Sequence, residues 1–309
     1  MKKEPILSVK DLSVSFQMYD NGLEKYDLKV ISNLTLDVRP GEIVAIAGSS
    51  GSGKSLLAHA VMGLLPENAS ISGEISYKGK VLGQKEKEAL RGKEMALVPQ
   101  SVSYLDPLMK VGTQVRGRKA DKEIIKAQRE IFRRFHLDEK TEQLYPFQLS
   151  GGMARRVLVS TAVLSGAEVI IADEPTPGLD LEMALEALKI FRELADEGKA
   201  VILITHDIDL AFHIADRIAV FYAGTTVEIA AAKDFLEGVD ALRHPYSKAL
   251  WKALPQNGFE PIPGFQPYAK YLPKGCLFSP RCPYKTKECE ENIPMREVRG
   301  GYVRCIHAD

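Results

Sequence analysis

Apolar runs typical of buried strands recur along the chain, and helical patterns separate several of them. Residues 6–16 and 30–38 alternate in part between apolar and polar positions, which predicts two strands near the start. Residues 43–47, 169–174 and 199–204 are apolar through most of their length, as parallel strands covered on both faces require. Strands that alternate with helices predict a doubly wound α/β core.

Shorter segments complete this pattern. Residues 70–98 predict further short strands, and residues 113–147 predict a polar helical insert with one apolar stripe. The remaining predicted elements are helices at 154–165, at 181–195 and between Asp207 and Arg217, and strands at 217–221 and 226–229. After a short predicted helix that starts at His244, Pro and Gly become frequent from Gln256 onward, which indicates a linker and a small loop-rich unit.

The predicted strand 43–47 leads into a glycine-rich loop that matches G-x-x-x-x-G-K-[ST]: Gly48, Ser49, Ser50, Gly51, Ser52, Gly53, Lys54 and Ser55. A helical pattern follows it, so the loop has the strand and helix that the motif needs, which argues against a chance Gly/Ser-rich turn. Its backbone N–H groups can bind phosphate oxygens at the start of the helix. Lys54 can reach the outer phosphates, and the Ser55 hydroxyl can bind Mg²⁺.

Polar residues follow other predicted strands at the edge where α/β proteins bind ligands. Asp173 suits Mg²⁺ and Glu174 suits activation of a water, although an acidic turn at a strand end is common. Gln100 and His206 also follow strands, and a lone histidine there is usually a polar loop residue. Ser150, Gly151 and Gly152 open a predicted helix and offer donors to an anion, a weak signal by itself.

Composition limits the possible functions. Lys and Arg number 41, as do Asp and Glu, so the formal charge is zero and bulk nucleic-acid binding is not expected. No apolar run approaches the roughly 18 residues of a membrane span, and no signal peptide is evident. We therefore expect a cytosolic protein, peripheral if it serves a membrane process.

In their order along the chain, these motifs together resemble the ATP-binding subunits of ABC transporters. The resemblance implies an α/β fold with a P-loop ABC-type nucleotide-binding domain, made of a mixed sheet core, an antiparallel β subdomain and a helical subdomain at about 101–165. Segments such as His244-Pro245-Tyr246 and Leu272 to Pro283 narrow it to the oligopeptide, dipeptide and nickel importers, which carry a C-terminal extension. The expected domains are residues 1–255 and a cysteine-containing extension at 256–309.

The resemblance also implies roles for individual residues. Residues 48–55 bind ATP; Ser55, Gln100 and Asp173 bind Mg²⁺; and Glu174, His206 and Gln100 take part in catalysis. The aromatic ring that stacks on adenine maps to Phe16 or Tyr19. Contacts between two ATPase subunits come from the remaining motif residues: Ser150, Gly151 and Gly152 reach the ATP bound by the facing subunit, and Asp180 links the two sites.

The expected function is an ATP-hydrolysing motor of an importer for peptides or for nickel and metal complexes. Its partners would be a second related ATPase, two transmembrane permease subunits and, indirectly, an extracellular substrate-binding protein. It would lie on the cytoplasmic face of the cell membrane. Among these cargoes, the short insert at 113–147 and the segment 144–147 slightly favour nickel. The alternatives are a soluble ABC ATPase of DNA repair or translation, against which the lack of long heptad runs argues, and an inactive copy, against which the motif residues argue.

All four cysteines lie in the last 34 residues, at positions 276, 282, 289 and 305. Such a small unit usually needs a cross-link to be stable, and in the cytosol a bound metal is favoured over a disulfide. The wide spacings favour a [4Fe–4S] cluster bound by Cys276, Cys282, Cys289 and Cys305, with zinc as the first alternative and free buried thiols as the second.

Overall fold

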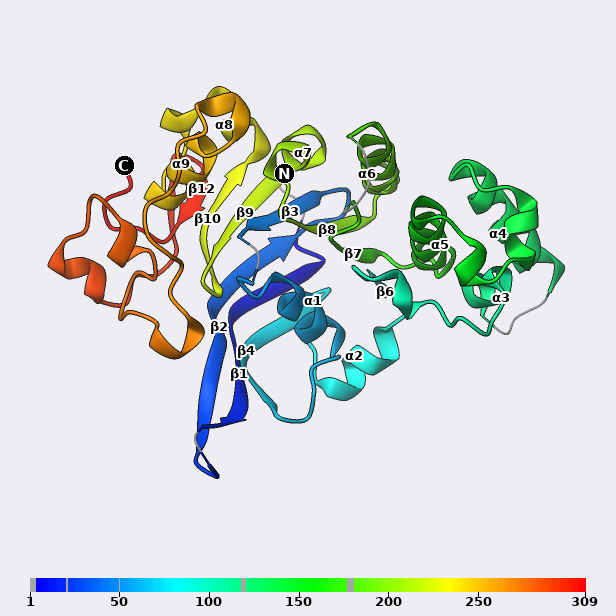
Figure 1. The fold of residues 1–309 in the computed structure, drawn as a ribbon, viewed down its shortest axis with the longest axis horizontal. Coiled ribbons are helices and arrows are strands. Elements are labelled where there is room, and N and C mark those ends of the chain that lie inside the picture. Colours follow the sequence, from blue (N-terminus) through cyan, green and yellow to red (C-terminus); the bar gives the residue numbers. More distant parts are fainter. Residues whose placement is uncertain (1–3, 21, 50, 118–120, 177–180) are drawn as a thin grey trace.

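The computed structural model describes residues 4–309 except 21, 50, 118–120 and 177–180. Two sheets and several groups of helices form an elongated molecule. A helical segment, residues 102–164, lies at one end, and the C-terminal part, from residue 232 onward, lies at the other (Figure 1). No helix in these described ranges is long and apolar enough to cross a bilayer.

The larger sheet has the strand order β11-β12-β10-β9-β3-β8-β7-β6 in the described part of the chain. Five consecutive strands, from the β6 edge to β9, run parallel. They are β6 (Met95–Val98), β7 (Val169–Asp173), β8 (Ala200–Thr205), β3 (Ile43–Gly48) and β9 (Arg217–Tyr222). The other three strands are antiparallel to their neighbours: β10 (Thr225–Ala231), β12 (Gly301–Val303) and β11 (Arg296–Val298).

Both faces of this sheet are covered, which explains its apolar strands. On one face, alternate residues such as Val44 and Ile46 pack with α1 (Lys54–Met62) and the smaller sheet. On the other face, Ile43, Val201 and Leu203 pack with helices of the second half of the chain. Those helices are α6 (Leu181–Asp196), α7 (Ile208–Ile214) and, on the helical segment, α5 (Gly151–Leu164).

The smaller sheet is antiparallel and has the order β2-β1-β4-β5. Its strands are β1 (Leu7–Tyr19), β2 (Lys25–Val38), β4 (Ala69–Tyr77) and β5 (Lys80–Val81). Strands β1 and β2 form a long hairpin that projects from the body of the molecule (Figure 1). Register shifts between Val9 and Ser15 bend the ladder over α1 and the large sheet.

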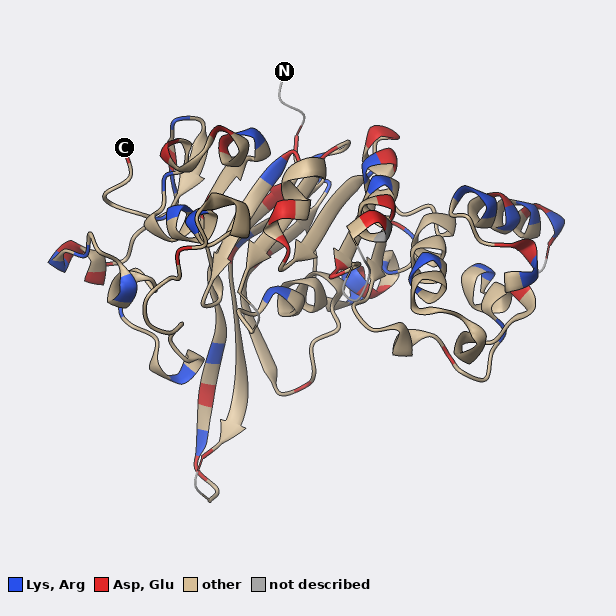
Figure 2. Cartoon of the chain, turned by 45° about the horizontal axis from the view of Figure 1, so that its top comes forward, with Lys and Arg blue, Asp and Glu red and all other residues tan. Residues whose placement is uncertain are grey.

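The helical segment contains η1 (Val102–Tyr104), α3 (Val111–Arg116), α4 (Lys122–Arg134), η2 (Glu139–Gln143), η3 (Pro146–Gln148) and α5. Helix α4 buries only Gln128 and Phe132 and carries charges of both signs on its outer side (Figure 2). Asp121 caps α4 by accepting a hydrogen bond from the Ile124 N–H at 2.9 Å.

The C-terminal part packs on the large sheet. It contains α8 (Ala232–Glu237), η4 (Val239–Ala241), α9 (Pro245–Lys252), η5 (Pro255–Asn257), η6 (Ala269–Tyr271), η7 (Ser279–Arg281) and η8 (Lys287–Glu290), before β11 and β12. Phe278 is buried against Tyr222 and Tyr246, at ring-centroid distances of 5.3 Å to each. The segment after residue 255 therefore shares its core with β9 and α9.

The structure confirms the predicted α/β fold, and it corrects one prediction. Within residues 70–98, which were predicted to form only strands, residues Gln84–Leu90 form the helix α2. The sequence Gln-Lys-Glu-Lys-Glu-Ala-Leu favours helix and offers no alternating apolar positions for a strand. Lys87 anchors α2 by donating from Nζ to the Ala60 carbonyl of α1 at 3.0 Å.

Candidate nucleotide site

The glycine-rich loop joins β3 to α1, as the sequence predicts. Gly51 and Gly53 have φ values of 73° and 96°, a conformation that residues with a Cβ rarely adopt. Gly48 is required for a different reason: an added Cβ would lie 2.2 Å from the Phe221 carbonyl oxygen of the neighbouring strand β9. The loop is therefore tied closely to the sheet while its N–H groups curl into a cradle.

Lys54 is buried at the start of α1 and reaches back across the loop. Its Nζ donates to the carbonyl oxygens of Gly48 and Ser49, at 2.9 Å each. Burial lowers the pKa of Lys54, and the nearby carboxylates of Glu174 and Asp173 oppose this effect. A buried ammonium held beside a curled loop is suited to bind phosphate.

Ser55 lies beside the acidic end of β7. Its Oγ donates to Asp173 Oδ1 at 3.1 Å, so a hydroxyl and a carboxylate oxygen meet at one point. Burial raises the pKa of Asp173, and the hydrogen bond from Ser55 opposes the rise. Two oxygen donors next to a phosphate-binding loop form a set that fits Mg²⁺.

Glu174 holds the centre of a polar group. Gln100 Nε2 donates to its Oε2 at 2.7 Å, and His206 Nδ1 lies 3.3 Å from its Oε1. Its backbone has φ 45°, which is uncommon for a residue with a side chain, and its N–H donates to the Ile204 carbonyl of β8 at 2.9 Å. The strained backbone turns the carboxylate toward residues that follow β6 and β8.

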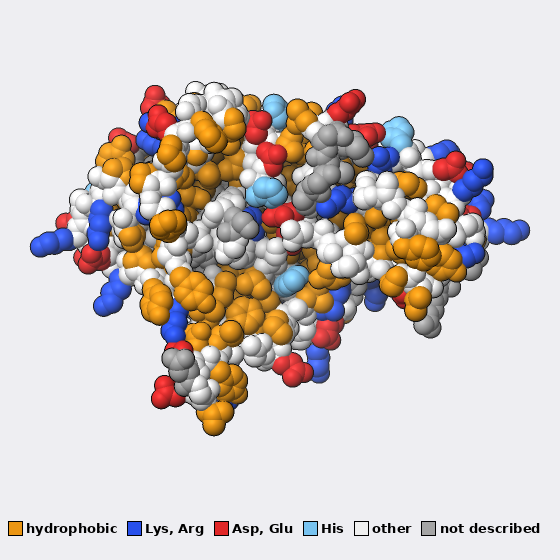
Figure 3. Space-filling view, in the orientation of Figure 1, with side chains coloured by type: hydrophobic (Ala, Val, Ile, Leu, Met, Phe, Trp, Pro, Cys, Tyr) orange, Lys and Arg blue, Asp and Glu red, His pale blue; other side chains and the backbone are white. Residues whose placement is uncertain are grey.

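These residues come together because β6, β7, β8 and β3 are parallel neighbours whose carboxyl ends meet at one edge. In Figure 3, acidic and histidine side chains gather near the middle of the face shown. Gln100, Asp173, Glu174, His206 and the loop, which were predicted from separate strands, thus form one cluster.

Ser150, Gly151 and Gly152 begin α5, on the helical segment. Ser150 Oγ caps the helix by accepting from the Met153 N–H at 3.2 Å. Gly151 is exposed and Gly152 is buried. The start of α5 is therefore accessible at Ser150 and Gly151, as a contact with a second subunit would require.

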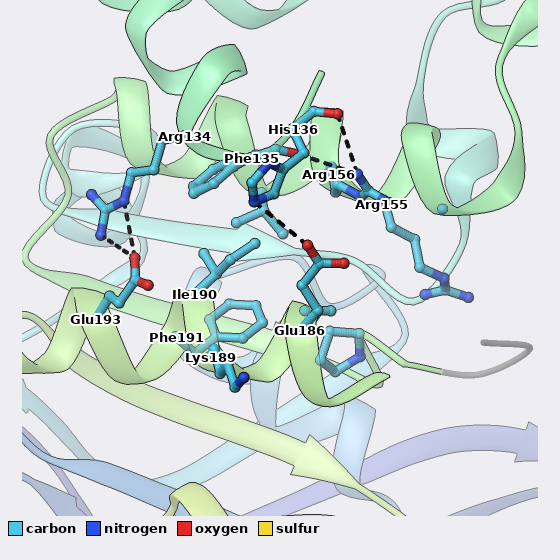
Figure 4. A pocket seen from close by; sticks show the side chains of 14 residues that line it. Arg134, Phe135, His136, Arg155, Arg156, Glu186, Lys189, Ile190, Phe191 and Glu193 are labelled. Atoms are coloured by element: carbon cyan, nitrogen blue, oxygen red, sulfur yellow. Dashed lines mark hydrogen bonds and ion pairs between the residues drawn. The ribbon is translucent and has the colours of Figure 1, made fainter. Parts of the chain in front are cut away.

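The sequence did not single out Arg155 as a contact of the catalytic cluster. Its Nη1 donates to the main-chain carbonyl of Glu174 at 3.2 Å, and burial lowers the pKa of its guanidinium. Arg155 also lines a cavity of about 250 Å³ between the helical segment and α6 (Figure 4). The only sequence signal was its place in the first turns of a helix that starts with the Ser-Gly-Gly motif.

An ion pair and a histidine–carboxylate contact bridge this cavity from the end of α4 to α6. Arg134 Nη2 lies 2.9 Å from Glu193 Oε2, and His136 Nε2 lies 3.6 Å from Glu186 Oε1. In Figure 4 the two pairs lie on either side of Ile190. They connect the helical segment to the core through groups that water can still reach, so each contributes little by itself.

The two aromatic residues predicted to stack on adenine lie in different surroundings. Phe16 is partly buried, packs against the core between the two sheets and pairs in register with Leu28 of β2. Tyr19 is exposed near the hairpin tip, with Lys25 Nζ 5.6 Å from its ring centroid. Ser50 and Asp180, also predicted as site residues, lie outside the described residues.

The four cysteines are free thiols in the C-terminal part, where Cys289 and Cys305 are buried and Cys276 and Cys282 partly so. His307 Nε2 lies 3.5 Å from the Cys289 sulfur. In the described residues, which include all four cysteines, no group of three or more His, Cys, Asp or Glu side chains is arranged to hold a metal. The structure therefore does not support the expected cluster or zinc site.

Comparison with known proteins places the site in a family. Residues 31–177 match the model of the ABC transporter family, and residues 227–289 match the oligopeptide/dipeptide transporter C-terminal region. The chain is 36% identical to the oligopeptide transport ATP-binding protein OppD of Escherichia coli K12, over 97% of this chain and 92% of that protein. It is 34% identical to the dipeptide transport ATP-binding protein DppD of Bacillus subtilis 168, over 96% and 92%.

Solved structures show the same fold. An ATP-binding cassette solved as a post-hydrolysis dimer with ADP and Pi is 26% identical, with a TM-score of 0.64, and the match covers 73% of this chain and 98% of that one. The protein cbiO1 of Clostridium perfringens, part of an ABC transporter complex, gives the same identity and TM-score over 81% and 100%. The chain therefore belongs to the ABC transporter ATPases, in the group that carries the oligopeptide/dipeptide transporter C-terminal region.

Proposed function

We propose that this chain is the ATP-hydrolysing subunit of a peptide importer. The observation that carries the proposal is the cluster at the carboxyl edge of the sheet, where Lys54, Ser55 and Asp173 adjoin Glu174 and its partners. The relatives named above are ATP-binding proteins of oligopeptide and dipeptide transport, which favours a peptide cargo over nickel or a metal chelate.

In this proposal, the phosphates of ATP bind to the loop N–H groups and Lys54. Ser55, Asp173 and Gln100 would hold Mg²⁺, which would neutralise phosphate charge. Glu174 accepts a proton from a water whose oxygen attacks the γ-phosphorus, and the bond to the β-phosphate oxygen breaks to give ADP and phosphate. Gln100 and His206 orient the Glu174 carboxylate through the two contacts described above.

The rest of the machine is also part of the proposal. A second, related ATPase subunit would face this one, so that Ser150, Gly151 and Gly152 bind the γ-phosphate of its ATP and Asp180 links the two sites. ATP bridges the two subunits and ADP cannot, so hydrolysis would open the dimer. Two transmembrane permease subunits would take up this motion at the cytoplasmic face of the membrane, with a substrate-binding protein outside.

The alternative functions in DNA repair or translation are less well supported. A repair ATPase of the chromosome-maintenance type would place long coiled coils between the phosphate loop and Asp173. In the described residues of that interval the longest helix is α5, with 14 residues. A translation factor would carry two such domains in one chain, whereas this chain matches 92% of the length of each of the two transport ATP-binding proteins named above.

The substitution Glu174→Gln tests the role of the carboxylate. We expect ATP hydrolysis to fall roughly 100-fold or more, because an amide is a poor base, while ATP binding persists. The matched control is Glu168→Gln, at the opposite end of β7, where the carboxylate pairs with Lys78. Steady-state phosphate release and ATP affinity are measured on the assembled transporter, and a Glu174→Gln protein that retains wild-type turnover would exclude Glu174 as the base.

For the four C-terminal cysteines we propose a bound [4Fe–4S] cluster, with zinc as the alternative. The thiols provide a suitable donor set, although their arrangement in the structure is not that of a metal site. The Cys276 N–H donates to the Cys289 carbonyl at 2.8 Å. Burial, with a smaller effect from the other three thiols nearby, raises the pKa of the Cys276 thiol to about 11. Iron, sulfide and zinc analysis after strictly anaerobic purification tests the proposal, and protein that lacks all three would contradict it.

A further inference from the structure

The phosphate loop contacts the C-terminal part of the chain through Ser49. Its Oγ donates to Gln266 Oε1 at 2.6 Å. Ser49 also hydrogen-bonds Tyr246 of α9; burial raises the pKa of this tyrosine to about 12, and the bond to Ser49 opposes the rise. A loop expected to hold only phosphate is therefore attached to residues about 200 positions away.

Gln266 belongs to a segment that we call the strap, residues 262–272, which lies along β2. One end is fixed by Arg281, whose Nε donates to the Pro263 carbonyl at 2.7 Å and whose Nη2 donates to the Ile262 carbonyl at 2.9 Å. Near the other end, Lys270 pairs with Asp20 of the β1–β2 hairpin and lies 4.5 Å from the centroid of the Tyr26 ring. These contacts fix the strap beside the loop independently of Gln266.

A cavity of about 320 Å³ lies between the strap and the phosphate loop. Its size is in the range of small-molecule sites, which run from roughly 300 to 1,000 Å³. Three structures form its walls: the loop, strand β2 and the turn after β9, and the strap. The residues are Gly51 and Ser52; Leu28, Val30 and Ala223; and Gln266, Pro267, Tyr268, Ala269 and Leu272.

The walls of this cavity suit a purine base. The phosphates of a bound nucleotide are fixed at the loop, so the nucleoside must lie just beyond it, and the cavity begins at Gly51 and Ser52. Leu28, Pro267 and Leu272 provide apolar surface, and Tyr268 adds an aromatic ring that is 61% exposed. In Figure 3, hydrophobic side chains gather on this face below its centre, where the hairpin meets the C-terminal loops.

We propose that the strap completes the nucleotide site by forming the wall that faces the base and ribose of ATP. The proposal rests on the ATP-binding function proposed above, and it gives the C-terminal extension a direct part in binding. Tyr268, Pro267 and Leu272 contact the nucleoside, and Gln266 positions the loop through Ser49. Phosphate binding and base binding are therefore assigned to different parts of the chain.

The test compares ATP with inorganic tripolyphosphate, which has the phosphates but no base. Binding of each, with Mg²⁺, is measured by calorimetry on the full-length protein. For Tyr268→Ala we expect roughly tenfold weaker ATP binding, because a ring contact with a base is lost, and unchanged tripolyphosphate binding. The matched control is Phe265→Ala, which removes a ring of the strap that is 93% exposed and does not line the cavity.

The outcomes separate this proposal from the one on which it rests. If Tyr268→Ala weakens both ligands equally, or weakens ATP no more than Phe265→Ala does, the strap does not bind the base. If the wild-type protein binds neither ATP nor tripolyphosphate, the proposed ATP-binding function itself is wrong. Lys54→Ala should weaken the binding of both ligands, so it shows how loss of the phosphate contacts differs from loss of the base contact.

A second measurement uses the unchanged protein, so it does not depend on the folding of a variant. Irradiation with 8-azido-ATP attaches the probe through its purine ring to nearby side chains. We expect labelled peptides that contain residues 266–272, with labelling suppressed by excess ATP. Specific labelling that includes no peptide from residues 266–272 would overturn the proposal.

Discussion

His244 is a buried histidine whose neutral form holds together two parts of the C-terminal region. It is 1% exposed and caps α9, where its Nδ1 accepts from the Tyr246 N–H at 3.0 Å. The main-chain N–H of His244 donates to Glu228 Oε2 at 2.8 Å, and the centroid of the imidazole ring lies 6.0 Å from that of the Phe278 ring. Burial lowers the pKa of His244 from 6.5 to about 3. Protonation at Nδ1 would remove the acceptor that caps the helix.

The size of the effect follows from these two pKa values. The unfolded chain binds a proton below about pH 6.5 and the folded chain does not until near pH 3, so acid favours the unfolded chain across this interval. At about pH 5, each unit below 6.5 costs about 1.4 kcal/mol, so His244 lowers the free energy of unfolding by about 2 kcal/mol relative to neutral pH. Above about pH 6.5 both the folded and the unfolded chain keep His244 neutral, so this loss of stability is absent.

The substitution His244→Asn keeps an acceptor for the cap and removes the titration. Urea unfolding at about pH 7 and pH 5 should show a loss of stability in the wild-type protein that is about 2 kcal/mol larger than in the variant. The charged neighbours Glu228, Arg243 and Asp234 are present in both proteins. The exposed His213→Asn serves as the control and should retain the wild-type pH dependence. Equal losses in wild type and His244→Asn would refute the assignment.

Substitutions also test three other features. Lys54→Ala should weaken ATP binding at least tenfold, measured by calorimetry, because a buried charge contact to phosphate is lost; unchanged affinity would contradict the phosphate cradle. Ser150→Arg should leave this chain's own ATP binding intact and abolish hydrolysis in the assembled transporter, and normal transport would refute a shared site. Gly48→Ala should lower stability by more than about 2 kcal/mol through the clash with Phe221, whereas Gly51→Ala, with open space around it, should cost only about 1 kcal/mol from backbone strain; equal thermal shifts would contradict the steric argument.

The parallel strands of the large sheet could be predicted from sequence because each is a short, mostly apolar run, and polar residues end or follow β7 and β8. That pattern fixed the positions of Asp173, Glu174 and His206 at one edge, where the structure brings them together. The short strands β11 and β12 have no such run and were not predicted. The helix α2 was missed because its seven residues are mostly charged and bury only Lys87, so it leaves no apolar stripe.

The contacts across the site could not be predicted in the same way. Nothing in the local sequence pairs Ser49 with Gln266, or Arg155 with the Glu174 carbonyl, because these bonds depend on how distant segments pack. The strap lacks the periodicity of a helix or strand, so composition indicated only a linker there. Its role follows from tertiary position, which no local pattern encodes.

The pairing of β12 with β10 has a consequence for how the chain folds. Glu228 lies opposite Val303, and Arg304 Nη2 donates to the Asn33 carbonyl at 2.8 Å, a bond that joins residues 271 positions apart. Contacts of such long range form slowly, and β10 presents a bare edge until β12 pairs with it. A chain without β12 would keep that edge open to other strands, so the pairing of β12 with β10 protects the folding protein from aggregation.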